Sequence, residues 1–474
     1  MPETLDGTYE RTLQDLGNQN WEYAHRLLQC VAVAVRPLRV EELADFLAFD
    51  FNTESSPIFR EDWRSEDPAY AVQSTCSSLL TVVDVDGSQV IQFSHFSVKE
   101  YLMSKRLRDA NDTVSRFHVS MTPAHTMIAH ACLGVLLHLD AEHNLKNFPL
   151  ANYAAEHWFT HTLFEDVSPM IQNAMRRLFD PSKHHLAICV WIYDPIFLWR
   201  HFDRSEYPSQ PRAPPLHYAA FTGIEDLVEF LIISHSQDVN SRCLENETAL
   251  SIASQKGHSK VARVLLEHGA DTEIKDKDDR NPLQWASFEG HPEVVQLLLE
   301  FGADVEAKTM CNNNALMFAS AKGHLAVVRL LLGHGADVKA RIVRNSTPLH
   351  CASNAGVAQI LLQHGADANA RNDEGRTPFH CPLVYGNRVE VAKFLLLLQH
   401  GAEVNSRDHS NQTTLHLASQ EGHLDLVRLV LQRGADIHVQ DMHGQTPSQI
   451  ALLKGHNDVV RLLLEHGAKD HMMQ

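Results

Sequence analysis

A pattern of about 33 residues returns eight times in the second half of this chain, and it restricts the fold to stacked copies of one unit. One copy, NPLQWASFEGHPEVVQLLLEFGADVEAK, covers residues 281–308. Asn281 and Pro282 suit the start of a short helix, Gly290 suits its end, and Pro292 suits the start of a second helix. Two helices of this length cannot bury their apolar faces alone, so each copy needs neighbours stacked on it.

The alanine at position 286 marks the spacing of the copies. Its equivalents are Ala219, Ala253, Ala286, Ala319, Ala352, Pro382, Ala418 and Ala451. They are separated by 34, 33, 33, 33, 30, 36 and 33 residues. With TPLH at residues 347–350, TPFH at 377–380 and recurring GH and GAD, the copies resemble the ankyrin repeat family. The resemblance implies antiparallel helix pairs joined by β-hairpin fingers, with a concave surface of finger tips and first helices that binds partner proteins.

Three copies depart from the pattern. The spacing predicts a second helix three residues shorter in the fifth copy (356–365) and one three residues longer in the sixth (386–401). Pro382 falls inside the first helix of the sixth copy, where a proline can cost up to about 3 kcal/mol. We therefore expect a weak seam at copies five and six. In the eighth copy Ser448 and Gln449 replace the Leu and His of TPLH, which indicates a solvated last face.

The first 110 residues have the element order of a winged helix. Apolar spacing predicts helices over residues 3–16, 21–35, 40–48, 69–79 and 97–107. Two apolar strands, 80–85 and 89–93, flank the turn signal Asp86-Gly87. Winged helices often bind DNA, but the helix that would enter the groove, AYAVQSTCSSL, contains no Lys or Arg. Because phosphate contacts dominate DNA affinity, we expect no nucleic-acid binding, and retention on DNA would be needed to support that alternative.

Longer motifs in this half carry a second resemblance. LDGTYERTL at residues 5–13, RPLRVEELADFLAFD at 36–50 and QFSHFSVKEYL at 92–102 resemble the winged-helix segment that follows the NACHT nucleotide-binding domain in fungal NACHT and ankyrin proteins. Those proteins are signal-transduction NTPases of the STAND type. The resemblance continues into the repeats, and it implies a segment that couples nucleotide state to the sensor.

The chain lacks the motif on which nucleotide hydrolysis in that family would depend. No GxxxxGK[ST] phosphate loop occurs in it, so ATP or GTP hydrolysis has no visible means. The sequence thus resembles the C-terminal part of such a protein. Either it is a stand-alone derivative, or its nucleotide-binding domain is missing from this gene model.

The residues between these two parts form a helical connector, which gives the following domain organisation. Helices are expected over residues 123–139, 150–163, 167–179 and 186–199. We expect a NACHT-associated winged-helix domain at 1–110, the connector at 111–205, a proline-rich linker at 206–213, the ankyrin array at 214–470 and a tail at 471–474. The fold class is mainly α, with a small α+β domain first. The connector is expected to cover the apolar end of the first repeat.

Composition narrows the setting and the partners. The net charge of -18 argues against nucleic acid or an anionic membrane as the main partner. Eight scattered cysteines without a CxxC pair, and the lack of a secretory leader, favour a reducing compartment. No apolar run reaches the length of a membrane span. We expect a cytoplasmic protein, with the nucleus as the other compartment left open.

The 31 histidines invite a metal hypothesis, but most have a repeat position that explains them. They recur in TPLH, in GH and directly before GA. His157 and His161 share one helical face, yet two ligands do not make a zinc site. In His350-Cys351, adjacent helical residues point about 100° apart, so no nucleophilic pair forms. We expect no metal, no cofactor and no catalytic residue.

Recognition by an ankyrin-like array is expected on its loops, because the finger tips vary from copy to copy while the helices do not. The charge run EIKDKDDR at residues 273–280 lies at one tip. Although most charge runs are solvated turns, its position makes it a candidate contact. The candidate partner-binding tip residues are Arg242, Asn246, Lys277, Asp279, Arg280, Thr309, Asn312, Arg344, Asn345, Glu374, Arg376, His409, Asn411, His443 and Gln445.

The leading hypothesis from the sequence is a non-enzymatic scaffold or sensor that binds a partner protein on the concave face of its repeats, within NACHT-type signalling. The competing hypothesis is the coupling and recognition part of a NACHT NTPase. A transcript that runs through a phosphate-loop lysine in frame with Met1 would favour the second.

Overall fold

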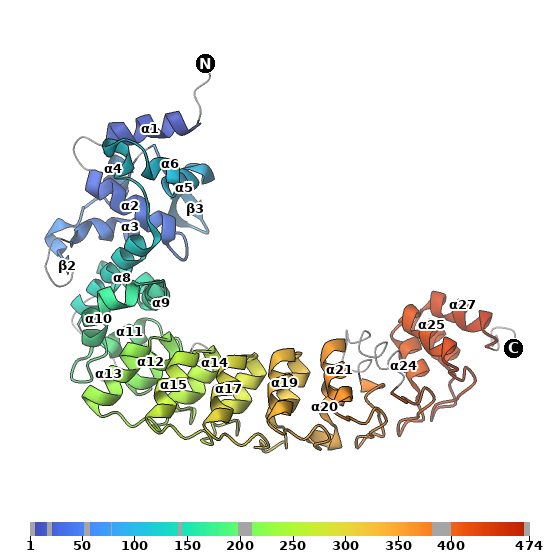
Figure 1. The fold of residues 1–474 in the computed structure, drawn as a ribbon. Coiled ribbons are helices and arrows are strands. Elements are labelled where there is room, and N and C mark those ends of the chain that lie inside the picture. The colour runs from blue at the N-terminus through green and yellow to red at the C-terminus, as the bar shows by residue number, and fades with distance from the viewer. Residues whose placement is uncertain are drawn as a thin grey trace. The chain divides into compact units, whose positions relative to one another are not determined.

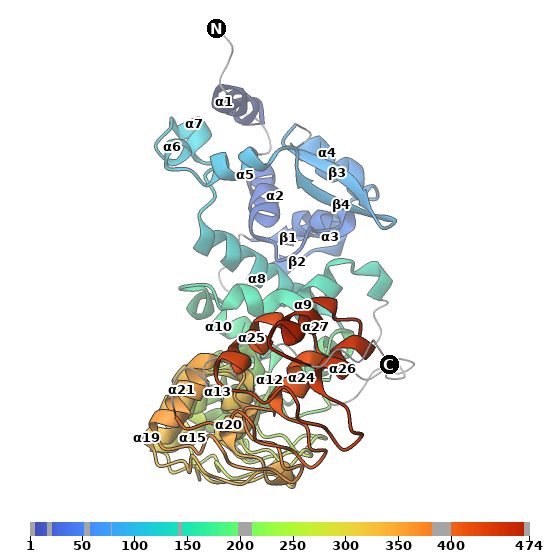
Figure 2. The same ribbon diagram turned by 90° about the vertical axis from the view of Figure 1, so that its right-hand side faces the viewer.

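A computed structural model describes residues 5–16, 21–51, 57–76, 78–140, 145–197, 211–381 and 400–468 (Figures 1 and 2). The chain divides into two compact units, residues 1–244 and 245–474. The first unit holds the winged helix, the connector and the first repeat, and the second unit holds the later repeats. In the described part of the chain, no helix is long and apolar enough to cross a membrane.

The winged-helix part contains helices, two short 3-10 turns and two small antiparallel sheets. Its helices are α1 (Leu5–Leu16), α2 (Trp21–Val33), α3 (Val40–Asp45), α4 (Pro68–Cys76), α5 (Phe96–Leu102), α6 (Lys105–Arg108) and α7 (Asp112–Ser115). Its strands are β1 (Phe49–Asp50) paired with β2 (Ile58–Phe59), and β3 (Leu80–Val85) paired with β4 (Ser88–Phe93). The predicted hairpin is present: Val85 pairs with Ser88, and Asp86 and Gly87 both have positive φ, as a two-residue turn requires.

Two details of this part differ from the prediction. The β1–β2 pair was not predicted: β2 lies within residues 55–68, where a loop is expected, and β1 lies just before it. Two residues per strand leave no readable alternation. The single helix expected over 97–107 is divided into α5 and α6. Ser104 interrupts it, because its hydroxyl accepts a hydrogen bond from the Leu107 N–H at 3.2 Å and caps a new helix.

The RPLRVEEL motif acquires a structural role around one buried carboxylate. Glu42 is fully buried, and Arg36 and Arg39 both pair with it at 2.8 Å. Burial alone would raise the pKa of Glu42, but the hydrogen bonds from Arg36 and from the Arg39 backbone hold that pKa below its usual value. The motif therefore fixes the start of α3 against the end of α2.

The connector consists of α8 (Met121–His138), α9 (Leu150–Thr162), α10 (Val167–Leu178) and α11 (His185–Ile192), and it packs on the first repeat as expected. That repeat is formed by α12 (Pro215–Thr222) and α13 (Glu225–His235). The rings of Phe159 and Phe221 lie 5.6 Å apart, and the Arg176 guanidinium stands 4.9 Å from the Phe230 ring centre. These contacts cover apolar surface that an end repeat would otherwise expose.

His161, one of the two connector histidines considered above for metal binding, is a buried core residue. It lies within hydrogen-bond distance, 2.9 Å, of both the Tyr153 hydroxyl and His125 Nδ1. Burial lowers its pKa to about 3, so the ring is neutral at ordinary pH. Among the described residues, no three His, Cys, Asp or Glu side chains gather as a metal site requires.

The second unit is a stack of helix pairs (Figure 1). Its first helices are α14 (Ala249–Lys256), α16 (Pro282–Glu289), α18 (Ala315–Lys322), α20 (Pro348–Cys351), α24 (Thr414–Gln420) and α26 (Pro447–Leu453). Its second helices are α15 (Ser259–Glu267), α17 (Pro292–Glu300), α19 (Leu325–Gly333), α21 (Ala355–Gln363), α25 (Leu424–Gln432) and α27 (Asn457–Glu465). First helices pack on first helices and second helices on second helices. Pro382 and most of the long second helix expected in the sixth copy lie outside the described residues.

One repeat shows why the sequence folds this way. Asn281 and Gln284 form a reciprocal capping box at the start of α16. Gly290, with φ 86°, ends that helix in the left-handed conformation. A Cβ at Gly290 would collide with the His324 ring of the next repeat, whose Nε2 lies 3.0 Å from the Phe288 carbonyl oxygen. The GH histidines thus join neighbouring repeats.

The prediction for the fifth copy is wrong. Its second helix, α21, has nine residues like the others, whereas its first helix, α20, has four instead of eight. The second helix must keep its buried Val357 and Leu361 between neighbours, so the deletion is absorbed at the end of the first helix. Asn354 then caps α21 and donates to the Gly323 carbonyl at 3.1 Å, in place of a GH histidine.

The expectation of a solvated face in the eighth copy also fails in part. Ser448 is 8% exposed and is therefore buried. Gln449 takes the place of the TPLH histidine, because its Oε1 accepts the Thr446 N–H at 2.9 Å. A polar residue was needed at position 449 to cap a helix, not to meet solvent.

Candidate partner-binding site

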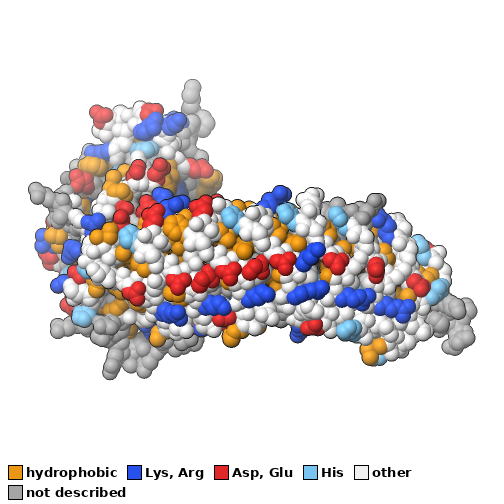
Figure 3. All heavy atoms as spheres, turned by 60° about the horizontal axis from the view of Figure 1, so that its bottom comes forward, with side chains coloured by type: hydrophobic (Ala, Val, Ile, Leu, Met, Phe, Trp, Pro, Cys, Tyr) orange, Lys and Arg blue, Asp and Glu red, His pale blue; other side chains and the backbone are white. Residues whose placement is uncertain are grey.

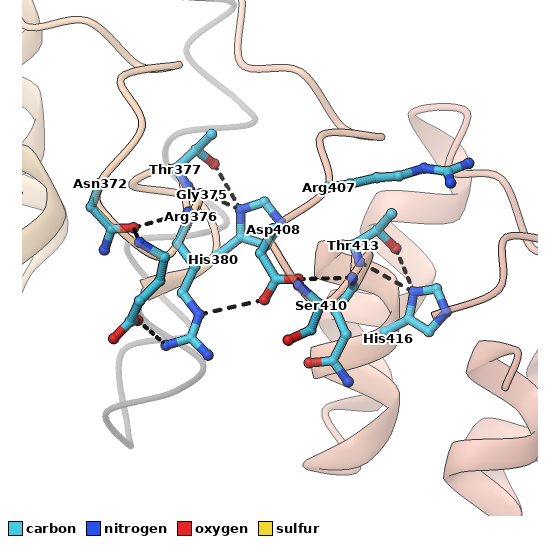
Figure 4. Close-up of polar contacts among 12 residues, drawn as sticks. Asn372, Gly375, Arg376, Thr377, His380, Arg407, Asp408, Ser410, Thr413 and His416 are labelled. Carbon is cyan, nitrogen blue, oxygen red and sulfur yellow. Dashed lines mark hydrogen bonds and ion pairs between the residues drawn. The ribbon is translucent and has the colours of Figure 1, made fainter. Parts of the chain in front are cut away.

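Four described fingers of the second unit are each closed by one buried turn residue, and Figure 4 shows two of them. Asp276, Asn372, Asp408 and Asp441 share this role. In each, Oδ1 accepts the backbone N–H groups two and four residues later, at 2.8–3.0 Å. The backbone N–H of the turn residue donates to the carbonyl four residues later, as from Asp408 to Gln412 at 2.9 Å. These four fingers are thus turns closed by a side chain, whereas the finger at Ile342 is closed by the backbone bond from Ile342 N–H to the Ser346 carbonyl. The described residues of the fingers contain no strand, unlike the β-hairpins expected.

Six candidate tip residues lie in the left-handed region. Arg344 has φ 53°. The other five are Asn246, Asp279, Asn312, Asn345 and Asn411, with φ between 56° and 61°. Asn and Asp tolerate this conformation better than other residues with side chains. Turn geometry therefore accounts for their residue type, and this chemistry is not by itself evidence of recognition.

Thr309 does not belong at an open tip. It is 8% exposed, and its hydroxyl accepts the Asn313 N–H at 3.2 Å, so it is the turn residue of its finger. The prediction of an open tip at this position is wrong, because the threonine stands where other fingers carry an Asp or Asn turn residue.

Five charged candidates are held by ion pairs within the chain, among them Asp279, which pairs with Lys275 at 3.2 Å. Glu374 forms ion pairs with Arg344, at 2.9 Å, and with Arg376. Arg376 also pairs with Asp408 of the next finger at 3.5 Å. Lys277 pairs with Glu245 of the preceding finger. The remaining candidates with open side chains are Arg242, His409, His443 and, partly, Gln445.

A row of basic side chains along the fingers was missed at the sequence level. Figure 3 shows Lys and Arg side chains running beside a row of acidic ones. One basic residue precedes the turn residue in successive fingers: Lys275, Lys308, Arg341, Arg371 and Arg407. Lys275 donates to the Lys308 carbonyl at 2.7 Å, Arg341 to the Arg371 carbonyl at 2.9 Å, and Arg371 to the Arg407 carbonyl at 2.7 Å. This row ties neighbouring fingers together.

The most developed surface feature is an aromatic cluster on the first helices of repeats three and four, here called the aromatic cluster: Trp285 and Phe288 of α16, and Phe318 of α18. The Phe288 ring centre lies 6.0 Å from that of Trp285 and 5.9 Å from that of Phe318, both edge-on. Trp285 Nε1 donates to Asp276 Oδ2 at 2.8 Å, which orients the indole. Trp285 and Phe288 are partly exposed, whereas Phe318 is 7% exposed.

Two cations cover this cluster. The Arg280 guanidinium lies 4.5 Å from the Trp285 ring centre and 5.2 Å from those of Phe288 and Phe318. Lys322 Nζ lies 4.2 Å from the Phe288 ring centre. Of these five residues, the sequence reasoning had selected Arg280 alone. Aromatic residues at the variable first-helix positions were the available signal.

The TPLH histidines stabilise the packing of neighbouring repeats. Nδ1 of His350 and His380 accepts the backbone N–H three residues earlier, and Nε2 lies 3.1 Å from a carbonyl of the next finger (Figure 4 shows His380). Burial lowers the pKa of both rings to about 4. They hold repeats together as neutral rings.

Comparison with known proteins agrees with this geometry. The family model "Ankyrin repeats (3 copies)" matches residues 216–309, 275–342, 316–408 and 396–473, which together exceed half of the chain. The chain belongs to the ankyrin-repeat family. Residues 9–117 of this ankyrin-repeat protein match the model "GPI inositol-deacylase, winged helix domain".

A curated relative is similar over a longer stretch. "Azaphilone pigments biosynthesis cluster protein L" of Monascus ruber is 31% identical over 286 residues. The match covers 56% of this chain and 59% of the relative, so the chain spans little more than half of the relative's length.

Proposed function

We propose that this ankyrin-repeat protein is a non-enzymatic scaffold or sensor that binds a partner protein on the concave face of its repeats. The observation that carries the proposal is the aromatic cluster with its two cations. Partly exposed Trp and Phe beside Arg are the residue types that dominate binding energy in protein interfaces. Ankyrin repeats are in general interaction modules, and stacked repeats offer a continuous surface for one partner.

The open finger tips form the rim of this proposed site. His409, His443 and Gln445 are proposed as rim residues, because their side chains are exposed or partly exposed. Arg242, which is exposed in the first unit, is proposed as a separate partner contact. Rim residues exclude water and adjust selectivity, but they contribute less energy than a central aromatic group. The proposed domain boundaries remain those given by the sequence.

A photo-crosslinking experiment tests the site. Position 289 follows Phe288 at the end of α16 and is exposed, whereas position 329 is exposed on the second helix α19. A photoreactive amino acid at position 289 should give a discrete protein adduct in cells that express the chain. The same group at position 329 should give none. Equal adducts at both positions, or none at 289, would contradict the proposal.

For the wider role we propose a place in NACHT-type signalling, as a STAND-like sensor or adaptor. Support comes from the winged-helix match followed directly by a helical connector and repeats. The relative named for a pigment biosynthesis cluster leaves open a role in such a cluster. The eight free cysteines, most of them buried, suit the proposed cytoplasmic or nuclear location.

The alternative is that these residues are the recognition half of a longer NTPase. Reading the 5′ end of the messenger RNA together with the upstream genomic sequence separates the two. An in-frame GxxxxGK[ST] segment would make the chain part of an NTPase sensor. A transcript that begins at Met1 would support the adaptor.

A further inference from the structure

We propose that Arg280 and Lys322, held over the aromatic cluster, form a receptor for a partner segment that carries a carboxylate beside an apolar side chain. The proposal rests on the proposed function and specifies the chemistry of the partner. The proposed partner is an acidic stretch of polypeptide.

Arg280 is oriented but has no acid to neutralise it. Three aromatic rings lie within 5.2 Å of its guanidinium, and within the described part of the chain no carboxylate pairs with it. A guanidinium held over aromatic rings keeps N–H groups that can donate hydrogen bonds to a partner. A carboxylate that reaches those groups can accept two parallel hydrogen bonds.

Two acids of its own finger are already used, and Asp278, at the position that Glu374 has beside Arg376, makes no ion pair with Arg280. Asp276 accepts two backbone N–H groups through Oδ1 and the Trp285 N–H through Oδ2. Asp279 pairs with Lys275 at 3.2 Å. The finger therefore holds its cation without offering it a counter-ion.

Lys322 adds a second positive charge over the same Phe288 ring, and no ion pair holds it within the described residues. Arg280 and Lys322 thus place two positive charges beside one aromatic ring in a chain of net charge -18. Arg280 is partly exposed and Lys322 is exposed, and a partner that excludes water from them would strengthen their attraction to a carboxylate. The rings beneath provide the apolar surface that a neighbouring Leu, Phe or Met of the partner would cover.

A variant that keeps Arg280, Lys322 and the aromatic cluster can test whether Arg280 binds a carboxylate. Thr309 is the turn residue of the finger that follows Arg280, and Asp408 has the same position beside Arg376, with which it pairs. Thr309→Asp should supply a carboxylate from within the chain and so compete with a partner for Arg280. Arg280→Ala removes the cation itself. Arg329→Ala removes one positive charge from an exposed site on α19 and is the matched control.

The probe is a display library of random 12-residue peptides, selected on the full-length chain, with each selected peptide then synthesised. Peptides enriched in Asp or Glu next to apolar residues are expected. Their affinity should fall at least tenfold with Arg280→Ala and with Thr309→Asp, and less than twofold with Arg329→Ala. Hydrogen exchange of each free variant checks that the repeats remain folded.

The outcomes separate the two proposals. Peptides whose hydrogen-exchange footprint lies on α16 and α18, but whose affinity ignores both variants or which lack acidic residues, would overturn this inference and leave the proposed function standing. Peptides that need a phosphate group would likewise overturn it. If no peptide protects the first helices, the proposed function fails as well.

Discussion

Arg280 and Arg376 occupy the same position in two fingers, four residues after the turn residue, yet their guanidinium groups have different surroundings. Arg376 pairs with Glu374 of its own finger and with Asp408 of the next (Figure 4). Arg280 lies over three aromatic rings, with no carboxylate partner in the part of the chain that the structure describes.

The difference arises in the neighbouring repeat. Asp408, with a side chain 2% exposed, closes its finger and turns its second oxygen to Arg376. Thr309 closes the corresponding finger beside Arg280 with a single hydroxyl and offers no charge. One residue about 30 positions away thus decides whether an arginine joins two repeats or remains available to a partner.

The largest expected effect is a loss of stability at low pH around Arg376, which the region around Arg280 should not share. His350 and His380 lie near Arg376, whereas repeat three has Gln284, which does not titrate, at the same position. The folded-state pKa of each histidine, about 4, is below the ordinary 6.5, so the unfolded chain binds more protons. Their stabilising contribution is complete above pH 6.5 and is lost as pH falls toward 4, by about 2 kcal/mol each between pH 7 and 5.

Hydrogen exchange, corrected for intrinsic rates, measures this loss. Amides of α20 and of residues 377–381 should lose protection between pH 7 and 5, and amides of α16 should keep theirs. Equal loss in both regions would show that the TPLH histidines are not its cause.

The next effect concerns the turn residues. Asp408→Ala leaves two partly buried N–H groups without their acceptor and removes the partner of Arg376 in the next finger, and should destabilise that finger by about 3 kcal/mol. Thr309→Ala loses one hydrogen bond and should cost about 1 kcal/mol. Local hydrogen exchange across residues 400–420 and 305–323 compares them. Similar values would mean that the charge pair with Arg376 adds nothing.

A smaller effect is expected inside the aromatic cluster. Trp285→Phe keeps the ring stack but removes the hydrogen bond to Asp276, and should cost about 1–2 kcal/mol. Fluorescence-monitored unfolding is unsuitable because the variant removes the reporter, so exchange of the α16 amides is the measurement. No change there would show that the indole N–H does not support the finger.

The smallest effects fall on the Arg280 pairing itself. Thr309→Asp should stabilise fingers three and four by about 0.5–1 kcal/mol, and Arg280→Ala should destabilise them by about 0.5–1 kcal/mol. Both changes should diminish at high salt, because screening weakens charge pairs near the surface. A loss above 3 kcal/mol with Arg280→Ala would make this arginine structural, like Arg376.

Much of the fold follows from the sequence because its signals are local. The capping pair Asn281 and Gln284, the left-handed Gly290 and the Asp86-Gly87 hairpin all act within a few residues. The repeat spacing then implied the stack, since no single helix pair could bury its own apolar face. For the candidate site, the sequence indicated only that the finger loops as a group are where a partner is contacted.

The tertiary structure decided which role each individual residue of the repeats has. It placed the three-residue deletion in α20, buried Thr309 and Ser448, and assigned left-handed geometry to Asn246 and its equivalents. It also left Arg280 over aromatic rings while it paired Arg376 with Asp408. These outcomes depend on contacts between residues about 30 positions apart, and a repeating sequence does not state which side chain of the next copy a given residue will meet.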